Sequence, residues 1–433
     1  MDVGTGGGEG KPSGARVAVI GGGISGLAAA YRLGARHHVT LYERHREPGL
    51  AIHGVALAGA GERVDIPLRV FTEGHYRNLL ALYAELGVET ETIAHSSAYA
   101  VADAEGRPRA PFLRYGVGPE GTAQENEALD ALGRRVTATH GDFVRMLLND
   151  TPGDVDTTLG LRDYLRARGV PDEYALRFVV PSFAGICTCS VEAAGAFPAD
   201  VALELLSCGI ERMGLRKVRG GAAQASTRFL ERLSDFRGGV EVQRVALEGE
   251  RVVVEQRDGQ RDRFDHVVIA TQANHAARIA DVPDDERALL QAVPYETVRV
   301  VVHDDDRLLP APQSRGAWNF LVAADGSAAS ASIWVNALQP RMPGRVFQTV
   351  NPLREPDPCG VLCDLQLERA LVSTDSAHVA PALQRLHAQS GRRLWFCGAY
   401  AARGVPLLEA GVTSALAVAA GIDAASEAAG RAR

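Results

Sequence analysis

The sequence predicts an α/β fold in which a discontinuous Rossmann-type domain is interrupted by a mixed α+β domain. Three observations support this prediction. Near the N-terminus, a short apolar run ends in glycines and is followed by a helical pattern and a second apolar run. Similar apolar strand patterns return in the middle of the chain and again towards its C-terminus. Between them lie long stretches that do not alternate strands with helices as a simple parallel-sheet domain does.

The first pattern lies in residues 16–44. Val17–Ile20 is β-branched, apolar and short, which favours a buried parallel strand over a helix. Three glycines follow it in GxGxxG spacing. Gly21 permits a tight turn, Gly23 lets a pyrophosphate approach the backbone, and Gly26 lets the next helix pack closely on the strand. The phosphates of a ligand would then lie at the N-terminus of that helix.

A second strand, Val39–Tyr42, ends at Glu43. A carboxylate at this position can accept hydrogen bonds from both ribose hydroxyls of a dinucleotide, and it would repel a 2′-phosphate. Because the glycines stand in strand context with a correctly spaced acid, the motif is more specific than glycines alone. The sequence therefore predicts a dinucleotide site that disfavours NADP, with a ligand-free glycine turn as the structural alternative.

The bulk composition restricts the class of protein. The 433 residues suffice for two or three domain-sized units. The net charge of −7 and the lack of a basic face make nucleic acid an unexpected partner. The apolar stretch 17–33 is broken by the glycine turn, so we expect no membrane span. Six scattered cysteines favour a reducing, cytoplasmic location, and none has the spacing of a metal site.

Further elements are expected along the chain. Residues 75–87 carry a helical apolar stripe that ends at a glycine, and several helical stretches broken by prolines lie within 142–214. A helix is expected from Leu408 to about Ile422. The expected strands start near Val240 and continue with Arg251–Gln256, Phe264–Thr271, Val298–His303, Ala317–Val322, Ser330–Asn336, Val346–Val350 and Leu394–Gly398.

A strand, a turn and a small-residue helix near the C-terminus could hold the ring of a flavin, with Gly398 at the strand end and Glu409 and Gly411 at the helix start. With these features the chain resembles the flavin-containing amine oxidase superfamily, most closely its bacterial branch of predicted FAD/NAD-binding oxidoreductases. The other matching segments are Val64-Asp65, Arg219–Gly221, Phe264–Thr271, Trp318–Phe320, Trp334–Gln339, Thr349–Pro352 and Trp395–Tyr400.

The resemblance implies FAD as the cofactor. It implies that the glycine turn with Ser25 binds the pyrophosphate, that Glu43 binds the adenosine ribose, and that the backbone of Val245 faces the adenine. It places the ribityl chain and the pyrimidine side of the flavin at Gly398 and at the turn from Glu409. The full set of implied cofactor-binding residues is Gly21, Gly23, Ser25, Gly26, Glu43, Arg44, Gly49, Val245, Thr271, Gly398, Glu409, Gly411 and Val412.

The resemblance also divides the chain into domains. The expected FAD-binding domain comprises residues 15–75, 215–275 and 385–425, and the expected substrate domain comprises 76–214 and 276–384. A flexible, glycine-rich tail is expected over residues 1–14 and a second tail over 426–433.

Two stretches depart from the pattern of the family. Relatives usually have a glycine pair shortly after the ribose-binding acid, where this chain has Gly49 and Leu50. Relatives also have a glycine after the Val-Asp pair, where this chain continues Ile66-Pro67-Leu68-Arg69. Both stretches normally approach the flavin closely, so a leucine side chain and a proline would reshape that wall.

Arg69 is the most unusual residue in this region. It could stabilise a reduced anionic flavin or hold a substrate carboxylate, or it could be a surface or salt-bridged arginine. His53 could act as a base, although a structural histidine is the simpler interpretation. Arg299 lies near the position of a lysine in some amine oxidases, and its role would be electrostatic. The residues expected to line an apolar substrate cavity, unless they are simply core, are Tyr295, Trp318, Trp334 and Tyr400.

These features predict an FAD-dependent oxidoreductase that removes hydride from a largely apolar small molecule, as an oxidase or desaturase of a lipid or secondary metabolite. Two alternatives stay open. The flavin could serve a reaction without net oxidation, as in an isomerase or cyclase. The same fold could also act as a non-catalytic carrier of a prenyl or acyl chain, as in the Rab-escort and GDP-dissociation-inhibitor relatives; Leu50 and Pro67 support this alternative.

Overall fold

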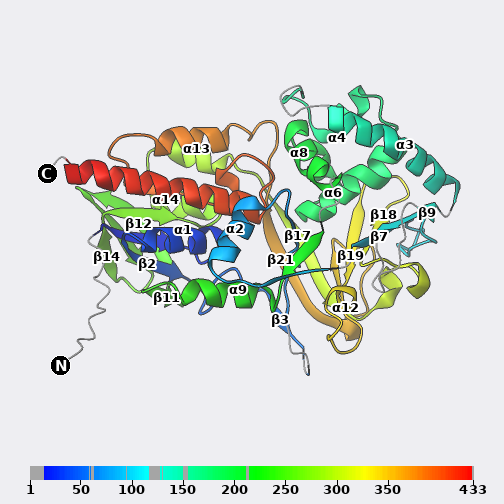
Figure 1. Ribbon diagram of the computed structural model, residues 1–433, viewed down its shortest axis with the longest axis horizontal. Coiled ribbons are helices and arrows are strands. Elements are labelled where there is room, and N and C mark those ends of the chain that lie inside the picture. Colours follow the sequence, from blue (N-terminus) through cyan, green and yellow to red (C-terminus); the bar gives the residue numbers. More distant parts are fainter. Residues whose placement is uncertain are drawn as a thin grey trace, which may run out of the picture.

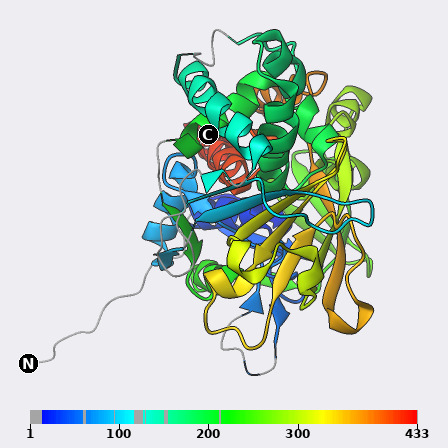
Figure 2. The same cartoon turned by 90° about the vertical axis from the view of Figure 1, so that its right-hand side faces the viewer.

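The computed structural model describes residues 14–57, 59, 63–93, 95–116, 127–128, 130–149, 155–210 and 214–431. In Figure 1, a parallel sheet enclosed by helices forms the left half, and a large mixed sheet beneath a layer of helices forms the right half; Figure 2 shows the large sheet and the helices above it from the right. The predicted α/β architecture is confirmed. The domain boundaries stay a prediction, and residues 1–13 of the expected tail lie outside the described residues.

The parallel sheet is built from strands that are far apart in the sequence. Its order is β11-β2-β1-β15-β22, and every pair in it is parallel. The three strands at its centre are almost fully buried, which explains their continuous apolar runs. One face packs against helices, and the other face packs against a four-stranded sheet and further helices. The bounds are β1 Arg16–Ile20, β2 His38–Glu43, β11 Phe236–Gly238, β15 His266–Ile269 and β22 Leu394–Phe396.

Helix α1 (Ile24–Gly34) lies between the parallel sheet and the long helix α14 (Leu408–Arg431), as the blue and red helices of Figure 1 show. The length and composition of α14 alone would allow it to cross a membrane. However, its apolar residues pack with those of α1 in one core, so burial inside the protein accounts for them. The helix continues to Arg431, and residues 426–431 are therefore not the tail that we expected; their alanine-rich sequence is a good helix former.

A four-stranded sheet of order β14-β13-β12-β16 packs beside the parallel sheet. Its strands are β12 Val242–Glu248, β13 Arg251–Gln256, β14 Arg261–Phe264 and β16 Ala280–Asp281. The helices of the same core are α10 Ala273–Ile279, α11 Asp284–Gln291 and α13 Val379–His387.

The right half contains an eight-stranded sheet of order β21-β17-β20-β19-β18-β7-β8-β9. Aromatic residues of β7 and β18, such as Tyr99 and Phe320, pack against the helices above the sheet. The strands are β7 Ser96–Val101, β8 Leu113–Gly116, β9 Glu127–Ala128, β17 Tyr295–His303, β18 Trp318–Val322, β19 Ala329–Trp334, β20 Phe347–Val350 and β21 Val361–Ala370. The helices are α3 Ala131–Asn149, α4 Leu161–Ala167, α5 Asp172–Tyr174, α6 Val180–Cys187, α7 Val191–Ala196 and α8 Ala199–Ile210, with a π-helical turn at Ala175–Val179.

Small elements connect the two halves. A three-stranded sheet of order β5-β10-β6 lies next to helices α2 and α9, and β3 pairs with β4. Their bounds are β3 Val55–Ala56, β4 Arg63–Val64, β5 Phe71–Thr72, β6 Thr90–Thr92, β10 Leu215–Val218, α2 Arg77–Glu85 and α9 Gly221–Leu230.

The large sheet differs from the sequence prediction at one strand end and at four strands that were not expected, namely β7, β8, β9 and β21. The strand expected at Ser330–Asn336 ends at Trp334, and a short helix, α12 (Val335–Leu338), follows. The side chain of Asn336 bonds to backbone atoms on the far side of the loop, including the N–H of Val346, and this holds the turn. Of the unexpected strands, the ten-residue β21 pairs with β17 along its whole length.

The contact between α1 and the glycine turn gives a first prediction. A Cβ atom at Gly26 would overlap the carbonyl oxygen of Gly21, whereas a Cβ atom at Gly34 would meet nothing within 4 Å. Gly26→Ala should therefore lower the free energy of unfolding by on the order of 2 kcal/mol, the scale of overpacking, and weaken flavin retention. Gly34→Ala, in the same helix, should be neutral or slightly stabilising. Chemical denaturation and the flavin content of the purified proteins measure both effects. Equal behaviour of the two variants would contradict the prediction.

Candidate active site

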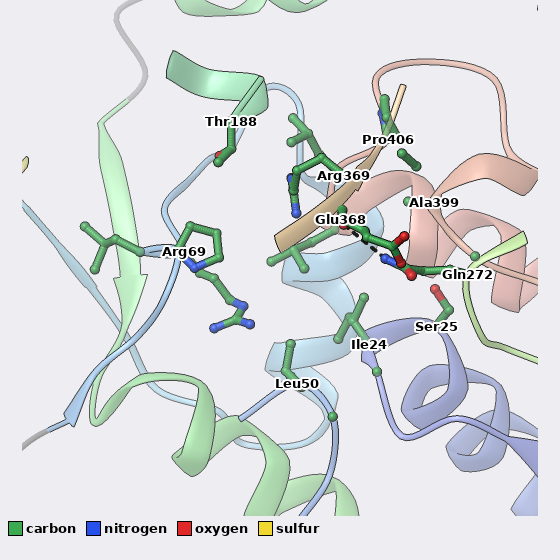
Figure 3. A pocket seen from close by; sticks show the side chains of 18 of the residues that line it. Ile24, Ser25, Leu50, Arg69, Thr188, Gln272, Glu368, Arg369, Ala399 and Pro406 are labelled. Atoms are coloured by element: carbon green, nitrogen blue, oxygen red, sulfur yellow. Dashed lines mark hydrogen bonds between the residues drawn. The ribbon is translucent and has the colours of Figure 1, made fainter. Parts of the chain in front are cut away.

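One cavity of about 950 Å³ extends between the two halves. Its wall begins at the glycine turn after β1, continues past the C-terminal ends of β2 and β15, and reaches the aromatic residues of β7 and β18. In parallel α/β sheets, ligands bind outside the carboxyl ends of the strands, which is where this cavity begins. Figure 3 shows part of the wall, with side chains from several separate segments around one space.

The glycine turn has the geometry that its sequence predicts. Gly21 adopts a positive φ of 107°, and its N–H donates a hydrogen bond of 2.8 Å to the carbonyl oxygen of Tyr42. Gly23 precedes the first residue of α1, lines the cavity, and has no atom within 4 Å of the place where a Cβ would stand. Ser25 also lines the cavity, whereas Gly26 faces Gly21 and serves packing. The N-terminus of α1 is thus open to an anionic group.

Glu43 lies at the cavity end of β2 and is almost fully buried. Its carboxylate accepts hydrogen bonds from the N–H groups of Gly22 (2.7 Å) and His45 (2.9 Å). Since each carboxylate oxygen can accept more than one hydrogen bond, acceptor capacity remains for a ligand hydroxyl. Arg44, Gly49 and Thr271 line the cavity around it.

Besides Gly26, four residues expected at the cofactor lie outside the cavity wall. Val245 is paired with Val254 on one side and Ala280 on the other, so its backbone serves the sheet, and Val242 lines the cavity instead. The carboxylate of Glu409 accepts hydrogen bonds from the N–H groups of Asn78 and Leu79, both 2.9 Å, at the start of α2. The other two are packing residues: Gly411 lies against Ser25, and Val412 is buried in the core.

The turn after β22 forms another part of the wall. Gly398 and Tyr400 both line the cavity, and a Cβ atom at Gly398 would collide with the ring of Tyr400. The hydroxyl of Tyr400 is buried and has no hydrogen-bond partner among the described residues. Burial raises the pKa of this phenol well above its usual value, so the group stays protonated and can donate a hydrogen bond. An orphaned buried donor at a cavity wall indicates a ligand acceptor.

Aromatic side chains line the far end of the cavity, together with a few polar groups. Trp318 lines it, and its ring meets His95 edge to face. The hydroxyl of Tyr99 lies 2.8 Å from that of Ser182. Burial lowers the pKa of His95, which favours the neutral imidazole.

Two residues expected at the substrate lie elsewhere or have another partner. Trp334 packs with Leu308 and Phe347 away from the cavity, because β19 turns its last side chain to the other face of the sheet. Tyr295 lines the cavity, but its hydroxyl accepts a hydrogen bond of 2.7 Å from the N–H of Ala273 at the start of α10.

Arg69 lines the cavity. The segment before it is fixed by two hydrogen bonds with the side chain of Gln348, which we call the clamp. The amide of buried Gln348, on β20, accepts a hydrogen bond from the N–H of Leu68 (2.8 Å) and donates one to the carbonyl oxygen of Asp65 (2.9 Å). The carboxylate of Asp65 in turn accepts from the N–H of Ala222 at the start of α9. In Figure 3 the guanidinium of Arg69 points into the space above Leu50.

The two other catalytic candidates are not part of the cavity wall. Arg299 lies on the opposite face of the large sheet, where its guanidinium forms ion pairs with Glu355 and Asp364, both at 2.8 Å. Strand alternation explains this position, because the neighbouring residues Val298 and Val300 take the buried face. His53 is half-buried close to the wall; burial and the positive charge of Arg69 lower its pKa and favour the neutral form.

The sequence analysis missed Arg369, whose side chain reaches the cavity from β21. A signal for it was present. From Cys363 to Ala370 the strand alternates, with Cys363, Leu365 and Leu367 on one face and polar residues on the other. Arg369 continues the apolar face, so period two predicts a charged side chain turned inward.

The site fits a flavin dinucleotide. Gly23 leaves room at a helix N-terminus for the pyrophosphate, Glu43 retains acceptor capacity at the strand end, and the orphaned hydroxyl of Tyr400 lies further along the same wall. Leu50 and Pro67 both line the cavity without closing it, so the departures of this chain from its relatives change the wall and leave the space open.

The parallel sheet, its glycine turn and the cavity beside them fit a dinucleotide-binding protein. The family model for flavin containing amine oxidoreductases matches residues 24–344. The chain therefore belongs to the flavin-containing amine oxidoreductase family, and its cofactor is FAD. No curated protein matches the sequence.

Solved structures show the same fold at low sequence identity. A fatty acid isomerase from P. acnes aligns with a TM-score of 0.65 and 15% identity over 95% of this chain and 98% of the other. Putrescine oxidase bound to putrescine has a TM-score of 0.66 and 17% identity over 95% and 99%. Cyclohexylamine oxidase from Brevibacterium oxydans has a TM-score of 0.66 and 16% identity over 96% and 100%.

The clamp on the segment before Arg69 gives a second prediction. Gln348→Leu leaves two backbone groups, the N–H of Leu68 and the carbonyl oxygen of Asp65, without their hydrogen-bond partner. Each unsatisfied buried group costs about 1–3 kcal/mol of stability. We expect a lower free energy of unfolding by that order, measured by chemical denaturation. Gln366→Leu, at an exposed position of β21, is the matched control and should change stability by no more than about 0.5 kcal/mol. A Gln348→Leu protein as stable as the control would show that the clamp is dispensable.

Proposed function

We propose that this protein is an FAD-dependent oxidoreductase of the oxidase or desaturase type that acts on a largely apolar small molecule. The observation that supports it most strongly is the single cavity that joins a dinucleotide cradle to an aromatic chamber. Bound FAD would supply the acceptor for a hydride, that is, a proton together with the electron pair of a substrate C–H bond.

The side chains of this chain would act by positioning and by excluding water. Trp318, Phe320 and Tyr99 present apolar surface to the substrate, which holds the scissile bond in one orientation and removes solvent from it. Neutral His95 and the hydroxyl of Tyr99 could bond a polar group of the substrate at this end. None of these steps requires a nucleophilic triad.

We also propose a cytoplasmic location and a small molecule as the binding partner. No disulfide joins cysteines in the part of the chain that the structure describes, and a reducing compartment keeps cysteines in this state.

The cofactor site gives a third prediction. Glu43→Gln keeps the shape of the side chain but leaves one oxygen where two are needed for the N–H groups of Gly22 and His45. The affinity of the flavin-free protein for FAD should fall at least tenfold, measured by quenching of flavin fluorescence. Glu47→Gln, an exposed carboxylate four residues further on, should leave the affinity unchanged. Equal affinities of the two variants would argue against Glu43 as a ligand of FAD.

The proposed reaction is tested by spectroscopy. The purified protein should be yellow and release FAD, identified by mass spectrometry. An apolar substrate should bleach the visible spectrum under anaerobic conditions, because the bound flavin becomes reduced. Turnover without any electron acceptor would identify an isomerase or cyclase instead. A colourless protein that gains no absorbance with excess FAD would support the lipid carrier and refute the proposed reaction.

A further inference from the structure

We infer that Arg69 and Arg369 together form a carboxylate-binding site, so that the substrate is an acid with an apolar chain. This inference rests on the proposed function and adds the chemical class of the substrate. It depends on two guanidinium groups that face one cavity and lack an acidic partner in the part of the chain that the structure describes.

Arg369 is a partly buried cation with one weak partner. Among the described residues, its hydrogen bond is a long one, 3.4 Å, from Nη2 to the carbonyl oxygen of Cys187 at the end of α6. Its Nε is buried and has no partner. A guanidinium carries five N–H donors, so one long hydrogen bond leaves most of this capacity unused. Since α6 packs on β18 and β19, this side chain is turned towards the substrate chamber.

Arg69 adds a second charge on the same wall. Burial and, to a smaller degree, the positive charge of Arg69 lower the pKa of Arg369, as expected for two cations that line one cavity. In Figure 3 both guanidinium groups point into the open space between Thr188 and Leu50. Two converging guanidiniums can bind the two oxygens of one carboxylate with charge-assisted hydrogen bonds.

The groups around Arg369 do not neutralise its charge. The neighbouring carboxylate in the cavity wall, Glu368, is directed elsewhere: its side chain is 45% exposed and lies 3.7 Å from Nε2 of His275. Burial raises the pKa of the Cys187 thiol and of the Tyr76 phenol, so both are neutral near pH 7. An uncompensated buried cation destabilises a protein, and its retention in a cavity wall is explained by an anionic ligand.

The rest of the chamber fits the apolar part of such an acid. Trp318, Phe320, Ala331, Ile333 and Ile186 line it beyond the arginines. An alkyl or aromatic body can bury its surface there while the carboxylate stays at the guanidiniums.

The test uses decanoate, decan-1-ol and decylamine as probes of one chain length with three head groups. Calorimetric titration of the oxidised flavoprotein should show decanoate binding at least tenfold more tightly than the alcohol, and the amine weakest. Arg369→Met and Arg69→Met should each weaken decanoate at least tenfold and leave decan-1-ol within about threefold. Arg369→Lys should recover part of the decanoate affinity because it restores the charge.

Two controls separate ligand binding from a structural role. Arg345→Met removes an exposed arginine paired with Asp306, outside the cavity wall, and should leave all three affinities unchanged. The Met variants at 69 and 369 should be at least as thermally stable as the parent, because each removes an uncompensated charge; a large loss of stability would indicate a structural arginine and overturn the inference. Equal affinity for decanoate and decan-1-ol, or unchanged decanoate binding in both Met variants, would overturn it as well.

The outcomes also distinguish this inference from the proposed function. A bound flavin that is reduced only by uncharged substrates would leave the proposed function intact and refute the carboxylate site. A protein that binds decanoate through both arginines and takes up no FAD would refute the proposed function and leave the carboxylate site intact.

Discussion

Helix α1 lies directly on the glycine turn, and the rest of the structure depends on this contact. The absence of a side chain at Gly26 lets the helix begin against the carbonyl of Gly21, which brings its N-terminal N–H groups to the edge of the parallel sheet. The same approach places Gly23 and Ser25 in the cavity wall. The other face of α1 is then covered by α14, so one close contact fixes both the ligand cradle and the core behind it.

Hydrogen bonds between distant segments fix the two halves relative to each other. Gln348 of the large sheet holds the segment 65–68, and Asp65 bonds to the start of α9. The carboxylate of Glu409 at the start of α14 holds the start of α2. Buried hydrogen bonds of this kind are specific in geometry, and they set the distance between the cofactor cradle and the cations of the chamber.

The features that could be predicted from the sequence are those determined by neighbouring residues along the chain. The glycine spacing, the acid after β2 and the longer apolar strands that we expected follow from backbone sterics and period-two patterns, and the structure has them at nearly the same residues; several short strands, as well as β7, β8 and β21, were not predicted. The site could be predicted only in part. Glu409 and Gly411 occur in a recognisable motif, but which side chain meets the cavity depends on the packing of α14 against α1 and α2, and that packing has no local signature. Strand alternation also decides which arginine faces the cavity. It turns Arg299 of β17 away from the cavity and Arg369 of β21 towards it, and Arg369 was missed because β21 had not been recognised as a strand.

The order of the strands in the sheet also bears on biosynthesis. Strand β22 and helix α14 follow all other strands of the parallel sheet in the chain, yet they complete its edge and cover α1. While the ribosome is still translating the intervening segments, the apolar side of α1 lacks its final cover, and such surface is prone to aggregation. The late segments also contribute Gly398, Tyr400 and Leu408 to the cavity wall, so the wall is complete only after the last part of the chain has been made.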